Sequence, residues 1–433
     1  MATQRKRPVR QLGGILLASA AIVAAAVPLR AQLITNVVPQ ERLESEEDQV
    51  KKDMDNARFH LGPVRLLPSF SVPNAGYNSN IYGTTENPVS DWTFTLQAGA
   101  RFLLPMGPKM YFRVNAFPSY TWSVNFPERN NFGGAFDASV LGFFNHAFLN
   151  LNGFYNEGYS IYSSQFPALT LVTTHGGTGE LEVRIVSRFS LFGGGYLQVV
   201  DYAQPGGTLP EQFDVRLNNR TDTAVRGGLR YHFSPQWSVG LMVEETWSDF
   251  QLVPETRNNH STGYLLTLNY NKPKFYLNLT GGYRQGEAID NSLFPSYETG
   301  IGSFFASYYP IHWLEVQGYG HRSVNYAVTD PLQPYYFENR LGGGVNIQFL
   351  SRFLLRGFAL EGPNQYPIRI SGGAPTPDQR VLTYGGGLSI KLIGKAVLTA
   401  TWTRNDYEQT VGYAGRSYDV FITNLTFSGE FQR

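Results

Sequence analysis

The chain has 433 residues and a formal net charge of +1, so it lacks the excess of positive charge that would attract nucleic acid. It contains no cysteine, which excludes thiolate chemistry and cysteine-ligated metals. Charged residues make up only 16% of the chain, which also holds 26 tyrosines, 30 phenylalanines and 45 glycines. This is poor in charge for a soluble enzyme and too polar for a helical membrane protein. Strands that face lipid on one side and water on the other would give this average.

The first 31 residues have the pattern of a secretory signal peptide. Basic residues at positions 5–10 precede an apolar run over 12–27, and small residues follow it. A single membrane anchor is the alternative, but the run is about 16 residues long and a spanning helix needs roughly 20. We therefore expect an exported chain that is cleaved after Ala31, with Ala26 as the second candidate site.

Residues 32–60 form a charged segment that differs from the rest of the chain. Acidic and basic side chains crowd positions 41–55, and apolar residues are few. This composition predicts a solvated helix or a linker, which we expect in the periplasm, outside the wall of the domain that follows. A helix that folds into that domain as a plug is the alternative.

Residues 61–433 alternate between apolar and polar positions with a period of two. In residues 92–104 every even position is apolar, while most odd positions are polar or glycine. The same alternation recurs in residues 224–233 and 384–392, and no helical period interrupts it. This is the pattern of β-strands that separate two environments.

Short and long connections alternate along this region, which is typical of outer-membrane barrels with tight turns on one rim and longer loops on the other. The runs between them can supply the roughly 9–11 residues that a tilted strand needs to cross a bilayer. We therefore predict an all-β fold, a transmembrane antiparallel up-and-down β-barrel of about 18 strands, within a range of roughly 16–18, with both ends on one rim. The short connections are expected at 105–108, 145–146, 187–188, 234–236, 272–274, 310–311, 350–351 and 393–394, and the long ones near 83–91, 124–133, 161–173, 204–218, 251–258, 288–296, 329–334, 362–378 and 409–416.

The tryptophans support a membrane barrel over a soluble β-sandwich or propeller, whose strands also alternate. All six lie towards the ends of expected strands, where aromatic side chains sit at the membrane–water interface. Soluble β-folds use shorter strands and do not sort their turns by length so regularly. The residues are Trp92, Trp122, Trp237, Trp247, Trp313 and Trp402.

No motif in the chain predicts catalysis, a metal or a cofactor. Glycine triplets at 193–195, 342–344 and 385–387 precede no helix and lack the lysine of a phosphate-binding loop, so we interpret them as bends and close packing within strands. There is no Gly-x-Ser-x-Gly, and no two histidines lie at the spacing of a helical zinc site. We therefore expect a protein that is not an enzyme.

The polar face of the expected strands places ten basic and six acidic residues in the lumen. A slight basic excess would favour anionic solutes or acidic polymers, but the charges could equally pair to brace the wall. Lumen aromatics at positions 111, 117, 276 and 319 could stack on sugar rings or act as filler. The charged candidates are Arg101, Arg113, Arg184, Arg226, Arg230, Arg284, Arg340, Arg352, Arg356, Lys391, Asp137, Glu182, Glu244 and Glu315, with Glu180 and Glu430 also on this face.

Two segments resemble known outer-membrane proteins. The element Gly-Tyr-Asn-Ser-Asn-Ile-Tyr at 76–82, followed by Asn-Pro-Val-Ser-Asp at 87–91, is similar to the first hairpin of β-barrel porin family 2, the outer-membrane β-barrel proteins of exopolysaccharide systems. The last strand, 417–431, carries aromatic and leucine residues at even spacing and resembles the signal that barrels present to their assembly machinery, although two residues follow it. The family resemblance implies a barrel of about 18 strands linked to export of secreted or capsular polysaccharide.

These observations predict a porin in the outer membrane that gives a polar path, with polysaccharide export as the favoured role. A general or solute-selective diffusion porin is the alternative, and an outer-membrane enzyme or an adhesin is a weaker one. The expected partners are outer-membrane lipid, the barrel assembly machinery and periplasmic polysaccharide-export components, with no nucleic acid.

Overall fold

The computed structural model describes residues 46–57, 59–165, 167–203, 214–289, 292–327, 332–368, 370, 377–392, 396–408 and 415–428. The expected signal peptide, the first part of the charged segment and Glu430 lie outside the described residues.

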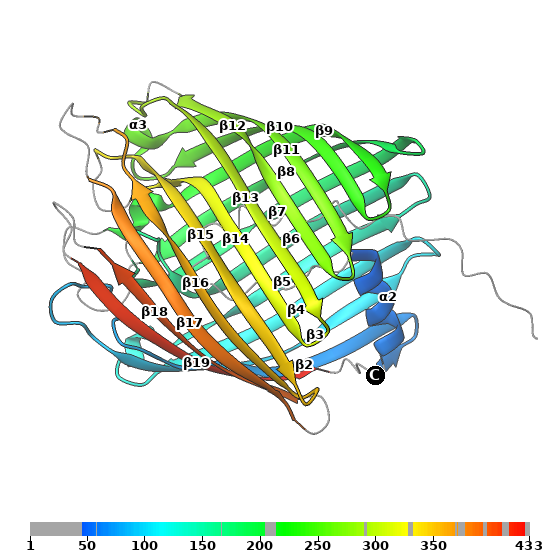
Figure 1. The fold of residues 1–433 in the computed structure, drawn as a ribbon, viewed down its shortest axis with the longest axis horizontal. Helices are drawn as coiled ribbons and strands as arrows, with labels where there is room; N and C mark the ends of the chain where they lie inside the picture. Colours follow the sequence, from blue (N-terminus) through cyan, green and yellow to red (C-terminus); the bar gives the residue numbers. More distant parts are fainter. Residues whose placement is uncertain are drawn as a thin grey trace, which may run out of the picture.

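The described strands form a closed antiparallel barrel of 18 strands, β2 to β19, in which each strand pairs with its neighbours in the chain and β19 pairs with β2 (Figure 1). The predicted fold class and strand number are confirmed. A three-residue strand, β1 (Phe59–Leu61), extends the start of β2 as a tight hairpin. The barrel strands are β2 (Val64–Asn78), β3 (Asp91–Pro105), β4 (Met110–Ser123), β5 (Asn131–Phe143), β6 (Ala147–Ile161), β7 (Leu169–Val186), β8 (Phe189–Ala203), β9 (Arg220–Ser234), β10 (Trp237–Phe250), β11 (Asn259–Lys272), β12 (Phe275–Ala288), β13 (Tyr297–Ile311), β14 (Leu314–Tyr326), β15 (Tyr335–Phe349), β16 (Phe353–Gln365), β17 (Gln379–Lys391), β18 (Ala396–Tyr407) and β19 (Arg416–Ser428).

The alternation in the sequence separates an apolar outer face from a polar inner face. In β8, Leu191 and Leu197 are 49% and 50% exposed, whereas the adjacent Ser190 and Gln198 are 1% and 7% exposed. A row of exposed leucines would be costly in water, because each leaves its apolar surface unburied, and is favourable against lipid. The outer face is therefore the one that suits a bilayer.

Turn length sorts the two rims as predicted. The turns after odd-numbered strands, such as 235–236 and 273–274, are short, and the connections after even-numbered strands, such as 79–90 and 251–258, are longer. We call these ends of the barrel the short-turn rim and the long-loop rim. β2 begins and β19 ends at the short-turn rim. Five tryptophans lie near strand ends, but Trp402 lies in the interior of β18.

The glycine triplets lie inside β8, β15 and β17, where neighbouring backbones pass close by. A Cβ atom on Gly342 would come within 2.3 Å of the Ala359 carbonyl oxygen, and one on Gly385 within 2.2 Å of the Trp402 carbonyl oxygen. Only glycine fits such positions without a backbone shift.

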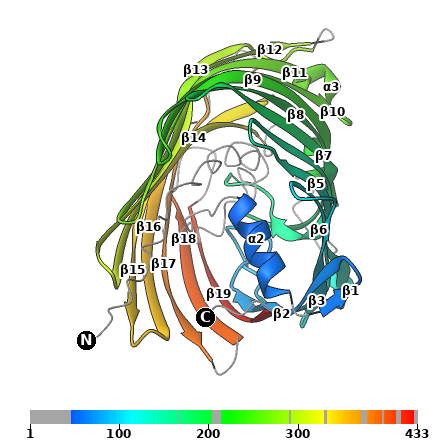
Figure 2. The ribbon, with the colours of Figure 1, turned by 90° about the vertical axis from the view of Figure 1, so that its right-hand side faces the viewer.

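The charged segment forms a helix, α2 (Glu46–Asn56), which lies inside the barrel (Figure 2). Val50 is fully buried and packs in one cluster with Leu67, Leu103 and Leu141 from the inner faces of β2, β3 and β5. The prediction of a linker outside the wall is therefore wrong for residues 46–57, and the plug-like alternative describes them. Apolar residues are few here, but those present fall on one face of the helix, which is enough for docking.

No helix among the described residues is long and apolar enough to cross a membrane.

The docking of α2 can be tested with single cysteines, because the chain has none of its own. Val50 is buried, whereas the neighbouring Lys51 side chain is 53% exposed. In the folded barrel we expect a maleimide reagent to label Lys51→Cys readily. Val50→Cys should be labelled at least about tenfold more slowly, because its labelling needs local opening of the structure. Equal labelling rates before unfolding would contradict a docked helix.

Candidate functional site: a constriction inside the barrel

The connection between β6 and β7 crosses the interior of the barrel near the long-loop rim. Ser164 donates its hydroxyl to Glu338 Oε2 of β15 at 2.9 Å, and Asn364 Nδ2 of β16 donates to the Ser164 carbonyl at 3.2 Å. Arg416 of β19 donates to the Gln165 carbonyl. Because β7 and β16 lie halfway round the ring of strands from each other, the described residues of this segment, 162–165 and 167–168, span the lumen. We call these residues the crossing loop.

The end of the β14–β15 hairpin at the long-loop rim leaves the wall and meets the crossing loop. We call its described residues, 323–327 and 332–338, the hairpin tip. Pairing between β13 and β14 stops at Gly302–Arg322, although both strands continue towards the long-loop rim. Beyond that point the Tyr326 ring packs against Phe250 of β10 at 4.7 Å between centroids, and its hydroxyl lies 3.1 Å from Asn259 Nδ2 of β11. The tip therefore leans into the barrel.

Arg322 occupies the gap that this bend opens in the sheet. Its Nε donates to the Gly300 carbonyl of β13 at 2.9 Å, and its Nη1 donates to Gln365 Oε1 of β16 at 2.9 Å. The guanidinium also lies over the Phe337 ring, 4.9 Å from its centroid. One side chain thus bridges strands that no backbone ladder joins at this level.

Glu338 is the centre of the contact between the hairpin and the crossing loop. It is 4% exposed and accepts from Asn325 Nδ2 at 2.7 Å as well as from Ser164. His321 Nε2 lies 3.4 Å and Arg340 Nε 3.6 Å from its other carboxylate oxygen. A buried carboxylate needs such compensation, and here it comes from a cation and several donors.

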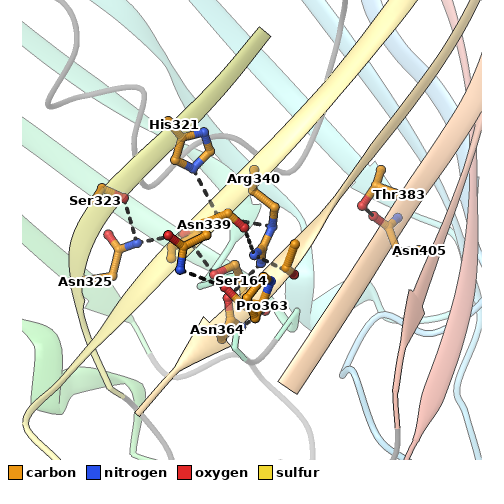
Figure 3. Close-up of polar contacts among 12 residues, drawn as sticks. Ser164, His321, Ser323, Asn325, Asn339, Arg340, Pro363, Asn364, Thr383 and Asn405 are labelled. Carbon is orange, nitrogen blue, oxygen red and sulfur yellow. Dashed lines mark hydrogen bonds and ion pairs between the residues drawn. The ribbon is translucent and has the colours of Figure 1, made fainter. Parts of the chain in front are cut away.

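Arg340 extends this network to β16. Its Nη2 donates to Asn364 Oδ1 at 2.7 Å, and its Nη1 donates to the Gly362 carbonyl at 3.0 Å. Figure 3 shows Ser164, Arg340 and Asn364 converging from the crossing loop and two strands. The constriction is therefore fastened to the wall rather than hanging free in the lumen.

Loops at the long-loop rim brace the crossing loop from above. Tyr162 donates its hydroxyl to the Val215 carbonyl at 2.9 Å, and the Leu169 amide donates to the Ile81 carbonyl at 2.8 Å. These residues share a buried cluster with Tyr82 from the connection after β2. Burial raises the pKa of the Tyr162 phenol well above its usual value, so it stays a neutral donor.

Arg257 joins the connection between β10 and β11 to the neighbouring connection between β8 and β9. It belongs to a short helix, α3 (Pro254–Arg257), and its side chain is fully buried. Nη1 donates to Asn218 Oδ1 at 2.5 Å at the end of the 3-10 helix η2 (Val215–Asn218), and the guanidinium lies over the Phe250 ring.

Several predicted lumen charges form ion pairs along the inner wall between β7 and β12. Arg226 Nη2 lies 3.1 Å from Glu180 Oε2, Arg230 pairs with Glu182, and Arg284 pairs with Glu244. Each pair joins different strands, as the bracing alternative would require.

The remaining charged candidates lie in several different surroundings. Arg101 and Arg113 pair with carboxylates of α2, and Arg340 belongs to the constriction. Asp137 accepts from Asn115 at 2.9 Å, and Glu315 accepts from Ser307, Gln317 and Asn346. Arg184 and Arg356 lie on β7 and β16, whereas Lys391 is exposed at the end of β17 and Arg352 lies exposed in the β15–β16 turn. The expectation that Arg352 belongs to a lumen-facing strand is wrong, because residues 350–352 form that turn.

The aromatic candidates Tyr276 and Tyr319 are packed as wall filler. They are 6% and 7% exposed and form one cluster with Phe305 and Leu360, and Tyr319 donates its hydroxyl to the Gly343 carbonyl at 3.2 Å. A ring this buried has no open face for a sugar. Tyr111 packs beside α2 against Phe143.

The sequence interpretation missed Glu338, His321 and Ser164, the residues at the centre of the constriction. Glu338 and Arg340 are two residues apart in β15 and therefore lie on the same face of the strand. The strand period that identified Arg340 as a lumen residue could have identified Glu338 as well. Ser164 carried no such signal, because a serine in a loop says nothing about which wall the loop reaches.

Among the described residues, no group of three or more histidine, aspartate or glutamate side chains could hold a metal ion.

The fold is that of outer-membrane porins, as comparison with solved structures shows. Pseudomonas aeruginosa OccK2 (OpdF) in complex with glucuronate aligns over 84% of this chain and 98% of its own, with a TM-score of 0.51 and 12% identity. The outer membrane protein OpdK of the same organism aligns over 84% and 98%, with a TM-score of 0.50 and 9% identity. The sequence matches no family profile and no curated protein.

Loss of the Glu338 carboxylate should destabilise the barrel measurably. Glu338→Gln removes the carboxylate that faces Arg340 and His321, and breaking a buried ion pair costs about 3–5 kcal/mol. The control Glu361→Gln removes the partner of Arg380 in an exposed pair, where we expect a loss within about 1 kcal/mol. The free energy of unfolding from urea titrations in lipid vesicles measures both. Equal losses would show that Glu338 does not hold the constriction.

Proposed function

We propose that this protein is an outer-membrane porin that lets small polar solutes diffuse through a constricted lumen. The single observation that carries the proposal is the crossing loop, which is tied by Ser164 to Glu338 on the opposite wall of a closed barrel. An inner face rich in polar and charged side chains supports a water-filled path, and a fastened constriction supports selection by size and charge.

This proposal reverses the order of the two roles that the sequence suggested. A growing polysaccharide needs a wide, continuous passage, whereas the crossing loop is tied to three strands of the far wall. OccK2, a protein of similar fold, was solved in complex with glucuronate, a small carboxylated sugar. A solute-selective diffusion porin therefore fits better than a polymer exporter.

Location and partners follow from the same proposal. The exposed apolar outer face suits outer-membrane lipid, and the short-turn rim would face the periplasm, as in other barrels of this kind. Export through a cleaved signal peptide and insertion by the barrel assembly machinery belong to this proposal.

Planar-bilayer recording tests the proposal. The purified barrel should give stable single-channel steps, and vesicles containing it should admit glucuronate or neutral monosaccharides but exclude polysaccharide. An absence of conductance, or passage of polymer, would contradict a solute porin.

Weakening the crossing loop should widen the path. In Ser164→Ala combined with Asn364→Ala, two polar ties to the far wall are lost, so we expect noisier steps and about twofold higher conductance. The control is Ser160→Ala, because among the described residues that hydroxyl donates to the adjacent Ile161 carbonyl of the same strand and not to the far wall. If the double variant conducts like the control, the crossing loop does not limit the path.

A further inference from the structure

The helix α2 occupies the inner face of the barrel near the short-turn rim. Its docking residues recur every three or four positions: Glu46, Val50, Asp53, Met54 and Ala57. The apolar members pack on Leu67, Leu103 and Leu141, which lie at the ends of β2, β3 and β5 that meet the short-turn rim.

Two ion pairs flank this apolar contact and join the helix to the lumen wall. Glu46 Oε2 lies 2.7 Å from Arg113 Nη1 of β4, and Asp53 pairs with Arg101 of β3. Asp53 is 2% exposed. The helix thus places a neutralising carboxylate beside each of two arginines of the lumen wall, and Arg101 also donates to Asn115 at 2.8 Å.

The opposite side of α2 faces the open lumen and carries charge of its own. Glu47 and Lys51 form an exposed ion pair one helical turn apart, at 2.5 Å. In all, the helix contains five carboxylates and two lysines, a formal charge of −3. With α2 in place, the helix's −3 and the +2 of Arg101 and Arg113 leave a formal charge of −1 at the short-turn rim. Without it, the wall would present Arg101 and Arg113.

We propose that α2 determines the ion selectivity of the short-turn mouth by masking these arginines and presenting its own carboxylates. Charges that line a pore set the field that an ion meets, and a lumen with low-dielectric walls strengthens that field. The docked helix therefore lowers the preference for anions that the bare wall would have. This inference rests on the proposed porin function, because it concerns what passes through the same lumen.

Reversal potentials across planar bilayers under a KCl gradient test the inference. A variant that lacks residues 46–57 should shift its permeability towards chloride, with the chloride-to-potassium ratio rising about twofold or more, and its conductance should rise because the lumen is emptier. Glu46→Gln combined with Asp53→Asn should shift the ratio in the same direction, since each arginine then lacks the carboxylate that neutralises its charge.

The matched control changes the open side of the helix without changing net charge. Glu47→Gln combined with Lys51→Gln removes one exposed ion pair and should keep the reversal potential of the original protein. Retention of the folded barrel in every variant is checked by its resistance to unfolding in detergent.

The outcomes separate the two proposals. If the protein and its helix-deleted variant conduct with the same reversal potential, the porin stands and the role of α2 is wrong. If only the deleted variant conducts, α2 closes the pore and the selectivity inference is overturned. If neither conducts, the porin proposal itself fails.

Discussion

The structure depends on one constraint: a strand that crosses lipid must find partners for all of its backbone N–H and C=O groups. Pairing of β19 with β2 satisfies this by closing the sheet, so the ring keeps no free edge in the apolar band. Near the long-loop rim the backbone pairing between β13 and β14 stops. There the Arg322 guanidinium donates to the Gly300 carbonyl in place of a backbone N–H of β14. This substitution allows the β14–β15 tip to leave the wall and build the constriction.

Closure also decides what the interior is made of. The apolar side chains of a barrel point outward, so the described interior is held by small apolar clusters and by paired charges. A buried ion pair adds little net stability, but removing one partner is costly, so such pairs act chiefly to specify position. The ion pair of Glu338 with Arg340 fixes the position of the crossing loop, and the ion pair of Asp53 with Arg101 fixes the position of α2. Both elements inside the lumen are thus located by carboxylates facing arginines.

Much of the barrel could be predicted because its determinants are local. Period-two alternation and turn length do not depend on distant residues, so strand number and the sorting of the rims followed directly. The helix was harder, because its docking face holds only a few apolar residues among many charges, and their value depends on Leu103 and Leu141 being there to receive them. The alternation also does not show where a turn begins and ends. It therefore placed Arg352 on the lumen face of a strand, although this residue lies in the turn before β16.

The amino-acid sequence by itself determined that this chain forms a closed, membrane-type β-barrel with tight turns on one rim, because those properties follow from the order of apolar and polar residues. Only the tertiary structure decided what fills the barrel. Ser164 and Glu338 are 174 residues apart in the chain, and Asp53 and Arg101 are 48 apart. No local pattern encodes such pairs, because they form only after closure has set the two walls facing each other across the lumen.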